Sequence, residues 1–258
     1  MILLAVLVVV VQWGAGWLFF LTLQAVVVAA LAEFYGLARR RKLEPRPSVG
    51  IPFALLIGAS FYLPQLPVQV ALLGGLILAG LVYLLLTDRV EKVASFTGSF
   101  AVTLFGAVYV GLTLNYLYTL RVERGPWTLY FLFAVIFSGD SGAFLFGKLL
   151  GRHRMTPMAS PNKTWEGAAG GIVFALVGAL AARSLFLRSV LPGQAALCGV
   201  LVHAVAQVSD PLESLFKRAA GVKDSSNLLP GHGGFLDRVD SFLLAAPFFY
   251  YYIRFFWT

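Results

Sequence analysis

The residues from Met1 to Ala32 include no charged side chain, and several later stretches approach 20 consecutive apolar residues. A helix of about 20 apolar residues crosses the hydrocarbon core of a bilayer, which is about 30 Å thick. Only 12% of the 258 residues are charged and 59% are apolar or aromatic, so the chain has too little polar surface for a water-soluble globule. The sequence therefore predicts a polytopic integral membrane protein and excludes disorder, coiled coil and collagen.

The predicted fold is all-α, a single integral membrane domain over residues 1–258 with about nine transmembrane helices. The first apolar stretch is too long for one crossing, and two Trp and two Gly residues within 12–17 indicate a break. The expected spans are 2–12, 17–37, 49–63, 68–86, 96–120, 127–146, 166–187, 195–209 and 241–256. We expect the helices within about 1–120 to act as a scaffold and residues 127–258 to carry the functional motifs.

Lys and Arg residues gather on one side of this predicted membrane layout. With the N-terminus in the cytoplasm, the cytoplasmic connections hold 15 of the 20 Lys and Arg residues, and the opposite side holds 5. Those connections are 38–48, 87–95, 147–165 and 210–240. Because short cytoplasmic loops carry an excess of Lys and Arg, the bias predicts a cytoplasmic N-terminus.

The net charge and the cysteine content exclude other classes of protein. A net charge of +8 suggests nucleic acid as the partner of a soluble chain, but no basic stripe with interleaved aromatic residues is present. In a membrane protein this charge reports topology and contact with anionic headgroups. The single cysteine, Cys198, excludes a disulfide framework and a cysteine-based metal site.

Seven of the 12 acidic residues lie between positions 140 and 240. They are Asp140, Glu166, Asp210, Glu213, Asp224, Asp237 and Asp240. A carboxylate within or beside a membrane span costs several kcal/mol unless it is paired or hydrated. The alternative to a functional role is that these acids neutralise nearby Lys and Arg residues or cap helices. Helix capping suits Glu166, which lies at a predicted helix start. Seven carboxylates on one side of the membrane favour a functional site.

One helical face is predicted where the eighth span continues past the membrane edge. Its polar residues are spaced by three and four positions, as His203, Gln207, Asp210, Ser214 and Lys217. The helix is expected to end at Gly221. We expect His203 to be a hydrogen-bonded interior residue and the remaining side chains to lie at the depth of the cytoplasmic headgroups.

The segment 223–240 combines a glycine-rich turn with acidic and basic side chains. The glycines at 231–234 let successive backbone N–H groups point at an anion. Asp237 and Asp240 are three residues apart on one helical face and suit a divalent cation, whereas Arg238 suits a phosphate oxygen. Carboxylates for a cation beside bases for phosphates are the composition that phosphoryl transfer requires.

Two further polar blocks lie upstream of this segment. Ser160 or Thr164 could cap the seventh span, whose N-terminus would then face the cytoplasm and favour an anion. Asp140 lies inside the otherwise apolar sixth span. An unpaired carboxylate in lipid is implausible, so we expect it to face a polar cavity lined by protein.

The residues from 214 to 240 resemble the signature of the phosphatidate cytidylyltransferase (CDP-diacylglycerol synthase) family. Every fixed position is matched, by Ser214, Lys217-Arg218, Lys223-Asp224, Pro230, His232-Gly233-Gly234, Asp237-Arg238 and Asp240. Residues 140–144 and 160–167 are similar to two other elements of that family. Three positions depart from the family pattern. Asn162 replaces a Lys and leaves Lys163 as the only base of its element, whereas Ser209 and Pro211 replace the Gly and Leu beside Asp210.

The resemblance implies that CTP and phosphatidic acid react to CDP-diacylglycerol and pyrophosphate, with Mg²⁺ required. It implies Asp210 and Asp237 as the principal metal ligands, with Asp240 and Asp224 as weaker candidates. Contacts with the triphosphate and the lipid phosphate are implied for Lys217, Arg218, Lys223, His232 and Arg238, and further substrate binding for Ser160, Lys163, Thr164, Ser214, Asp224, Gly233 and Gly234. It also implies a bacterial-type plasma membrane with the active site facing the cytoplasm, and leaves open a second, monovalent cation and a homodimer.

Two other functions stay open at this point. A CTP-dependent polyprenol kinase would transfer the terminal phosphoryl group to a lipid alcohol and release CDP, but the complete signature argues against it. A cation-coupled transporter would also use acids in the membrane, but its polar groups should lie near mid-bilayer, whereas these gather at one face. A CDP-alcohol phosphotransferase is disfavoured because no Asp-Gly-x-x-Ala-Arg element occurs.

Overall fold

The structure is a computed structural model, and it describes residues 2–87, 90–226, 228 and 233–257. These residues are helical apart from loops and one short antiparallel hairpin. The first helices are α1 (Ile2–Trp13), α2 (Gly16–Arg40), α3 (Pro47–Tyr62), α4 (Val68–Leu86), α5 (Val90–Gly106), the π-helical turn η1 (Ala107–Leu112) and α6 (Thr113–Arg124). Then follow α7 (Pro126–Leu150), β1 (Arg154–Thr156), β2 (Ser160–Thr164), α8 (Trp165–Phe186), α9 (Pro192–Ala219) and α10 (Leu236–Phe256).

The chain forms two compact units. Unit 1 comprises Met1–Tyr118 and Ala219–Val239, and unit 2 comprises Thr119–Arg218 and Asp240–Thr258. The segment 219–239, which carries most of the glycine-rich signature, therefore packs with the N-terminal helices. Helix α10 begins in unit 1 and continues into unit 2.

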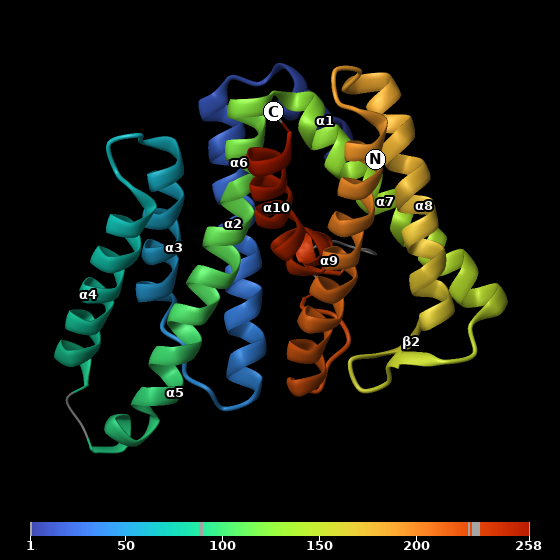
Figure 1. Ribbon diagram of the computed structural model, residues 1–258. Coiled ribbons are helices and arrows are strands. Elements are labelled where there is room, and N and C mark those ends of the chain that lie inside the picture. The colour runs from blue at the N-terminus through green and yellow to red at the C-terminus, as the bar shows by residue number, and fades with distance from the viewer. Residues whose placement is uncertain (1, 88–89, 227, 229–232, 258) are drawn as a thin grey trace. The chain divides into compact units, whose positions relative to one another are not determined.

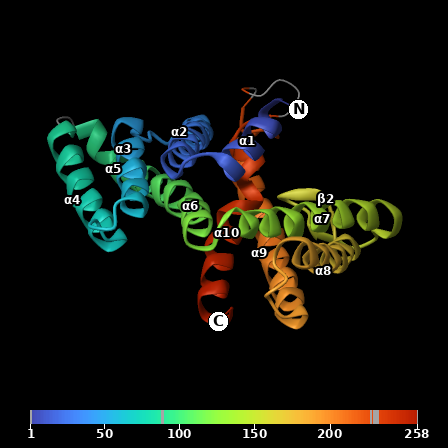
Figure 2. The same cartoon turned by 90° about the horizontal axis from the view of Figure 1, so that it is seen from above.

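Tyrosine hydroxyls hold the helices of unit 1 together. Tyr35 on α2 donates a hydrogen bond of 2.6 Å to the carbonyl oxygen of Thr103 on α5. The hydroxyl of Tyr83 on α4 donates to the carbonyl oxygen of Ser99 at 3.0 Å and lies 2.8 Å from Oγ1 of Thr103. Both tyrosines are buried, and buried hydroxyls require such partners. The α3–α4 hairpin lies beside α5 in this unit (Figures 1 and 2).

Helices α7, α8 and α9 of unit 2 approach closely because small residues lie where they cross (Figure 2). A Cβ atom at Gly139 on α7 or at Gly171 on α8 would overlap the ring of His203 on α9. Small residues allow membrane helices to approach without loss of packing. His203 is fully buried and its Nε2 lies 2.9 Å from Nε2 of Gln207, which confirms the expected hydrogen-bonded interior residue.

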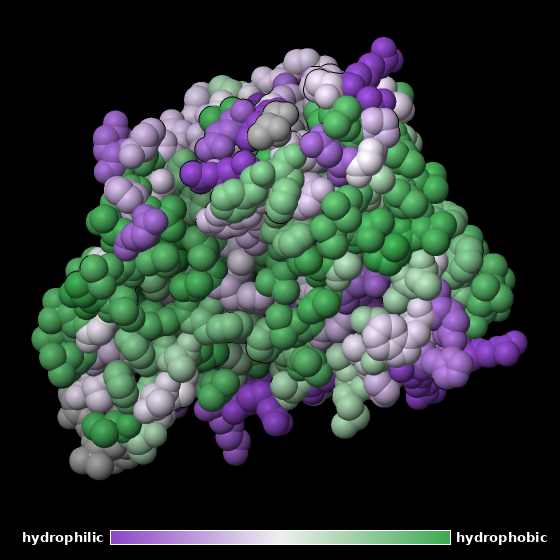
Figure 3. Space-filling view, in the orientation of Figure 1, coloured by the Kyte–Doolittle hydropathy of each residue, from purple (hydrophilic) through white to green (hydrophobic). Residues whose placement is uncertain are grey.

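Six helical stretches in the described part of the chain are long and apolar enough to cross a membrane. They are Gly16–Arg40, Val68–Leu86, Val93–Arg124, Pro126–Leu150, Trp165–Phe186 and Pro192–Ala219. Figure 3 shows hydrophobic side chains gathered over α3 and α4. The other predicted spans correspond to α1, α3 and α10, which are shorter or more polar. Nine crossings and a cytoplasmic N-terminus thus stay predictions.

Three local predictions are confirmed or extended by the structure. The first apolar stretch is two helices, since α1 ends at Trp13 and α2 begins at Gly16. Helix α9 continues past Ser209 and through Pro211 to Ala219, as the polar stripe predicts. The β1–β2 hairpin is an addition to the predicted all-α fold. Its strands have three and five residues and lack the alternation that would indicate strands.

Candidate active site

Lys163 and Asp210 form an ion pair in unit 2. Strand β2 carries Lys163 and helix α9 carries Asp210, and Lys163 Nζ lies 2.7 Å from Asp210 Oδ2. The other carboxylate oxygen of Asp210 accepts a long hydrogen bond of 3.4 Å from Ser214 Oγ, one helical turn away. Both members of the ion pair are about one-third exposed. The structure therefore brings together the loop base and the α9 carboxylate that the sequence predicts for one site.

Asp240, at the start of the unit 2 part of α10, belongs to the same cluster of charges. It lies within electrostatic reach of Asp210, Lys163 and Lys217. Ser209 Oγ donates to the backbone carbonyl of Asp240 and accepts from the backbone N–H of Leu244 at 3.3 Å. The hydroxyl at the position where the family pattern has Gly thus joins α9 to α10 beside the two carboxylates.

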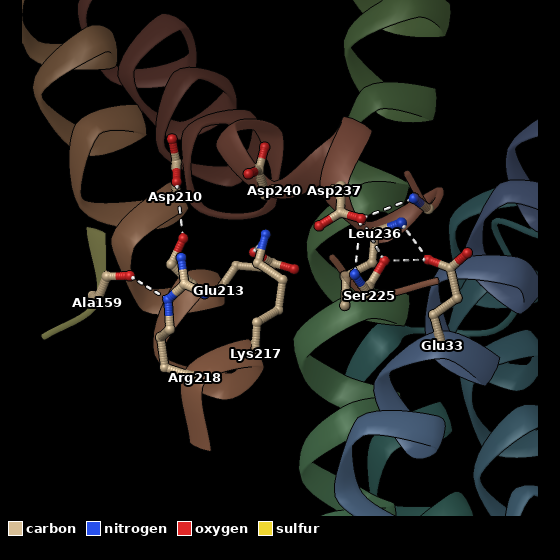
Figure 4. A network of polar contacts seen from close by, with 12 residues as sticks. Glu33, Ala159, Asp210, Glu213, Lys217, Arg218, Ser225, Leu236, Asp237 and Asp240 are labelled. Carbon is tan, nitrogen blue, oxygen red and sulfur yellow. Dashed lines mark hydrogen bonds and ion pairs between the residues drawn. The ribbon is translucent and has the colours of Figure 1, made fainter. Parts of the chain in front are cut away.

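The next turn of α9 holds a buried ion pair. Lys217 Nζ lies 2.5 Å from Glu213 Oε2, and both side chains are buried. Figure 4 shows them one turn apart on α9, with Arg218 on the same stretch of helix. Arg218 Nε donates to the carbonyl oxygen of Ala159 at 3.3 Å, next to β2. The sequence predicts phosphate contacts for Lys217, but it does not predict its pairing with Glu213.

The start of α8 fixes the hairpin that carries Lys163. Thr164 Oγ1 accepts from the backbone N–H three residues later at 3.1 Å, so it is the N-cap, one of the two caps predicted. The Glu166 carboxylate accepts from the backbone N–H groups of Arg152 and His153 at 3.1 and 3.2 Å. Its Oε1 also lies 2.6 Å from His153 Nδ1. Glu166 therefore ties the start of α8 to the residues that precede β1, whereas the helix capping that the sequence offers as the alternative for this residue is made by Thr164.

Asp140 on α7 contributes a further charge to unit 2. It lies within electrostatic reach of Lys163 and Asp210, so the three side chains gather from α7, β2 and α9. Its side chain is exposed and lies within a helix that is long and apolar enough to span a membrane. Asp140 thus lies near other charged side chains, but the polar cavity lined by protein that the sequence predicts around it stays a prediction.

In unit 1, Asp237 binds Ser225 and Gly234 of the signature segment. Its Oδ2 accepts from the backbone N–H of Gly234 at 2.8 Å and from the backbone N–H of Ser225 at 3.0 Å. Ser225 Oγ also lies 2.8 Å from the same oxygen. Gly233 has φ 76°, a left-handed conformation that favours glycine. Asp237 is therefore both a predicted metal ligand and an anchor for its own loop.

Sequence reasoning missed Glu33, a carboxylate on α2 that contacts this segment. Glu33 is the first charged residue of the chain, within the predicted span 17–37, and it is buried. The cost of a carboxylate inside a span, which singled out the later acids, applies to Glu33 equally. That signal was sufficient to find it.

The remaining predicted site residues are more exposed or lie outside the described residues. The side chains of Arg218, Lys223, Asp224 and Arg238 are exposed, and Ser160 is half-buried. His232 lies outside the described residues. Asp210 and Asp237 belong to different units, which are described separately, so a metal ion shared by them stays a prediction.

The donor set of unit 2 fits a hard divalent cation. Asp210 and Asp240 are carboxylates within electrostatic reach of each other. Mg²⁺ usually binds through one or two carboxylates, several waters and substrate phosphate oxygens. Among residues 2–87, 90–226, 228 and 233–257, no three or more His, Cys, Asp or Glu side chains gather as a metal site would require. A cation at Asp210 would therefore need water or phosphate oxygens as additional ligands.

Comparisons with known proteins show which family this chain resembles. The model of the cytidylyltransferase family matches residues 1–256. A phosphatidate cytidylyltransferase of Haemophilus influenzae is 42% identical over 143 residues, which cover 54% of this chain and 49% of that protein. One of Staphylococcus epidermidis is 38% identical over 180 residues, covering 70% and 68%, and one of Bacillus subtilis is 41% identical over 152 residues, covering 58% and 56%. The chain thus spans about half the length of the Haemophilus influenzae and Bacillus subtilis relatives.

Proposed function

We propose, from the premise that this chain belongs to the cytidylyltransferase family, that it transfers the cytidylyl group of CTP to phosphatidic acid. The products would be CDP-diacylglycerol and pyrophosphate. Relatives named phosphatidate cytidylyltransferase support this activity. The structural observation that supports it most is the pairing of Lys163 with Asp210, which places a cation suited to phosphate against a carboxylate suited to a divalent ion.

The proposed reaction needs charge neutralisation more than it needs a strong base. An oxygen of the lipid phosphate attacks the α-phosphorus of CTP, and the bond from that phosphorus to the pyrophosphate oxygen breaks. The attacking phosphate is already anionic at neutral pH, so the obstacle is to bring two polyanions together. In unit 2, Lys163 and Arg218 would bind and orient the phosphates, with Ser160 as a hydrogen-bond donor. Lys223 and Arg238 are exposed bases that we propose for the same purpose.

Asp210 and Asp240 are the residues of unit 2 that we propose to hold Mg²⁺, and Asp237 stays a predicted ligand. When bound, the ion would neutralise phosphate charge and polarise the reacting phosphoryl group. Lys163 forms an ion pair with Asp210. We expect Lys163 to exchange this carboxylate for a phosphate oxygen when substrate and metal are present.

The proposed setting is a bacterial-type plasma membrane, with the site facing the cytoplasm. The six apolar helical stretches support an integral membrane protein, and the excess of Lys and Arg in four connections supports a cytoplasmic N-terminus. The lipid phosphate would stay at the headgroup depth while CTP arrives from the cytosol.

The decisive experiment follows the phosphorus atoms of CTP. Purified protein in detergent is supplied with phosphatidic acid, Mg²⁺ and CTP labelled at either the α- or the γ-phosphate. The proposal requires α-label in the lipid fraction, γ-label in pyrophosphate, and neither product without phosphatidic acid.

Two companion assays would identify the alternatives, one with a polyprenol in place of phosphatidic acid and one with the protein in proteoliposomes. Transfer of γ-label to a polyprenol with release of CDP would establish the kinase. Cation flux into proteoliposomes without nucleotide turnover would establish a transporter. Absence of α-label in lipid under all these conditions would contradict the proposed function.

A further inference from the structure

Among the residues that the structure describes, Glu33 makes four hydrogen bonds, to partners about 200 positions later in the chain. Its Oε1 accepts from Ser226 Oγ at 2.6 Å and from the backbone N–H of Phe235 at 3.0 Å. Its Oε2 accepts from Ser225 Oγ at 2.9 Å and from the backbone N–H of Leu236 at 2.8 Å. Figure 4 shows the Glu33 side chain directed at Ser225 and Leu236. One carboxylate on α2 therefore gathers both ends of the segment 225–236.

Two of these donors are backbone N–H groups at the start of α10, that of Phe235 just before the helix and that of Leu236, its first residue. Helix α10 begins at Leu236, and the N–H groups at a helix start have no partner within the helix. The partial positive charge of a helix N-terminus favours an anion there. Glu33 supplies that anion from another helix, so it acts as a non-local cap for α10. Four donors offset the desolvation of a carboxylate that is only 5% exposed.

Ser225 couples Glu33 to Asp237. The Ser225 hydroxyl lies 2.9 Å from Glu33 Oε2 and 2.8 Å from Asp237 Oδ2. Gly234 lies against the same group, because a Cβ atom there would overlap Ser225 Oγ and the Glu33 carboxylate. The orientation of the Asp237 carboxylate and the positions of Ser225 and Gly234 therefore depend on the position of Glu33.

We propose that Glu33 is a positioning residue for the transfer reaction, which fixes the signature segment and the Asp237 carboxylate without touching substrate. The inference rests on the proposed function, because it assigns α2 a part in the same reaction. It gives the N-terminal helices a specific role beyond that of a scaffold. The loss of Glu33 should therefore disorganise residues 225–236 locally and slow turnover, while the helices of unit 1 stay folded.

The test compares Glu33→Gln with Glu44→Gln, a control that removes an exposed carboxylate of the same unit. The NH₂ group of the glutamine would face one serine hydroxyl and one backbone N–H, and that N–H can only donate, so at least one hydrogen bond is lost. Backbone deuterium exchange is measured by mass spectrometry in detergent, together with kcat per folded protein.

For Glu33→Gln we expect exchange in 225–236 to rise about tenfold or more, with exchange in α2–α4 unchanged. We expect kcat to fall about 10- to 100-fold, the scale of a misplaced catalytic group. Glu33→Asp should restore part of both.

A second variant keeps the inference testable if Glu33→Gln does not fold. Ser226→Ala removes one donor and leaves the carboxylate in place, so we expect the same two changes at about 3- to 10-fold. If Glu33→Gln folds, the double variant Glu33→Gln/Ser226→Ala should differ little from Glu33→Gln alone in exchange and in kcat, because both substitutions affect the contact between residues 33 and 226.

The outcomes separate this inference from the proposed function. An inactive wild-type protein would contradict the proposed function, whereas faster exchange in 225–236 would still report the Glu33 contacts. An active wild-type protein whose Glu33→Gln or Ser226→Ala variants match Glu44→Gln in exchange and kcat would overturn the inference. Unchanged kcat per folded protein with a general rise in exchange would show that Glu33 only stabilises the fold.

Discussion

At the scale of single residues, two ion pairs of unit 2 differ in their exposure. Lys163 on β2 pairs with Asp210 on α9. Further along α9, Glu213 pairs with Lys217, which lies one helical turn after it. The first pair is partly exposed and the second is buried, so they differ in what they can do. A partly exposed pair can exchange partners with a ligand, whereas separating a buried pair leaves an uncompensated charge. Lys163 and Asp210 are therefore the residues whose loss should affect turnover most directly.

Asp210→Asn tests the proposed metal ligand. The amide keeps the size of the side chain but removes the negative charge, which weakens an oxygen site for a hard cation. We expect a folded protein whose activity falls about 100-fold, the scale of losing a principal charge stabiliser, with partial recovery at high Mg²⁺. Glu44→Gln should be nearly silent. Near-normal turnover of Asp210→Asn at limiting Mg²⁺ would remove Asp210 from the metal site.

Lys163→Ala tests the loop base. Asn162 leaves no neighbouring ammonium to replace it, so we expect turnover to fall about tenfold or more because phosphate charge is no longer neutralised. Arg152→Ala is the matched control in the same connection, since the backbone N–H of Arg152, which donates to Glu166, is kept by the substitution. Initial rates with CTP and phosphatidic acid measure both variants. Equal and mild losses of turnover in the two variants would show that Lys163 contributes only to the membrane topology.

At the scale of elements, the signature segment is held by close approach as well as by hydrogen bonds. Gly234 has no space for a side chain, because Ser225 and Glu33 lie against its Cα. Gly193, near the start of α9, has nothing within 4 Å of the place where a Cβ would stand. The two glycines therefore offer the same substitution in a full and an open environment.

Gly234→Ala should lower the stability of the protein, whereas Gly193→Ala should not. Overpacking typically costs about 1–3 kcal/mol, so we expect the thermal midpoint in detergent to fall by roughly 3–8 °C. An exposed substitution is usually within about 0.5 kcal/mol, so Gly193→Ala should leave the midpoint almost unchanged. Equal midpoints for the two variants would contradict the contacts of Gly234 with Glu33 and Ser225.

At the scale of the whole molecule, the membrane layout combines six apolar helical stretches with a strong bias of positive charge. The prediction that follows places positions 153, 163 and 224 on the cytoplasmic side. The single native cysteine, Cys198, is fully buried, so replacing it by Ala gives a background for single cysteines at these positions.

Each single-cysteine variant should react with a membrane-impermeant thiol reagent in inverted vesicles and not in right-side-out vesicles. The reagent reaches only one face of the membrane, so the labelling pattern reports the side directly. A lytic detergent control should label all three positions in both preparations. Labelling of positions 163 and 224 from opposite sides would contradict both the topology and the proposed common site.

The sequence by itself determined the apolar helices, the break between α1 and α2 and the continuation of α9 through Pro211, and it limited the cap of α8 to Ser160 or Thr164. These features depend on neighbours within a few residues, so hydropathy, spacing and cap chemistry suffice to predict them. Tertiary structure alone decided that Glu33 contacts Ser225, 192 residues away, and that Lys163 pairs with Asp210. A carboxylate accepts from whichever donors the fold brings within about 3 Å. The sequence can show that a buried charge needs partners, but only the packing of distant helices decides which partners it has.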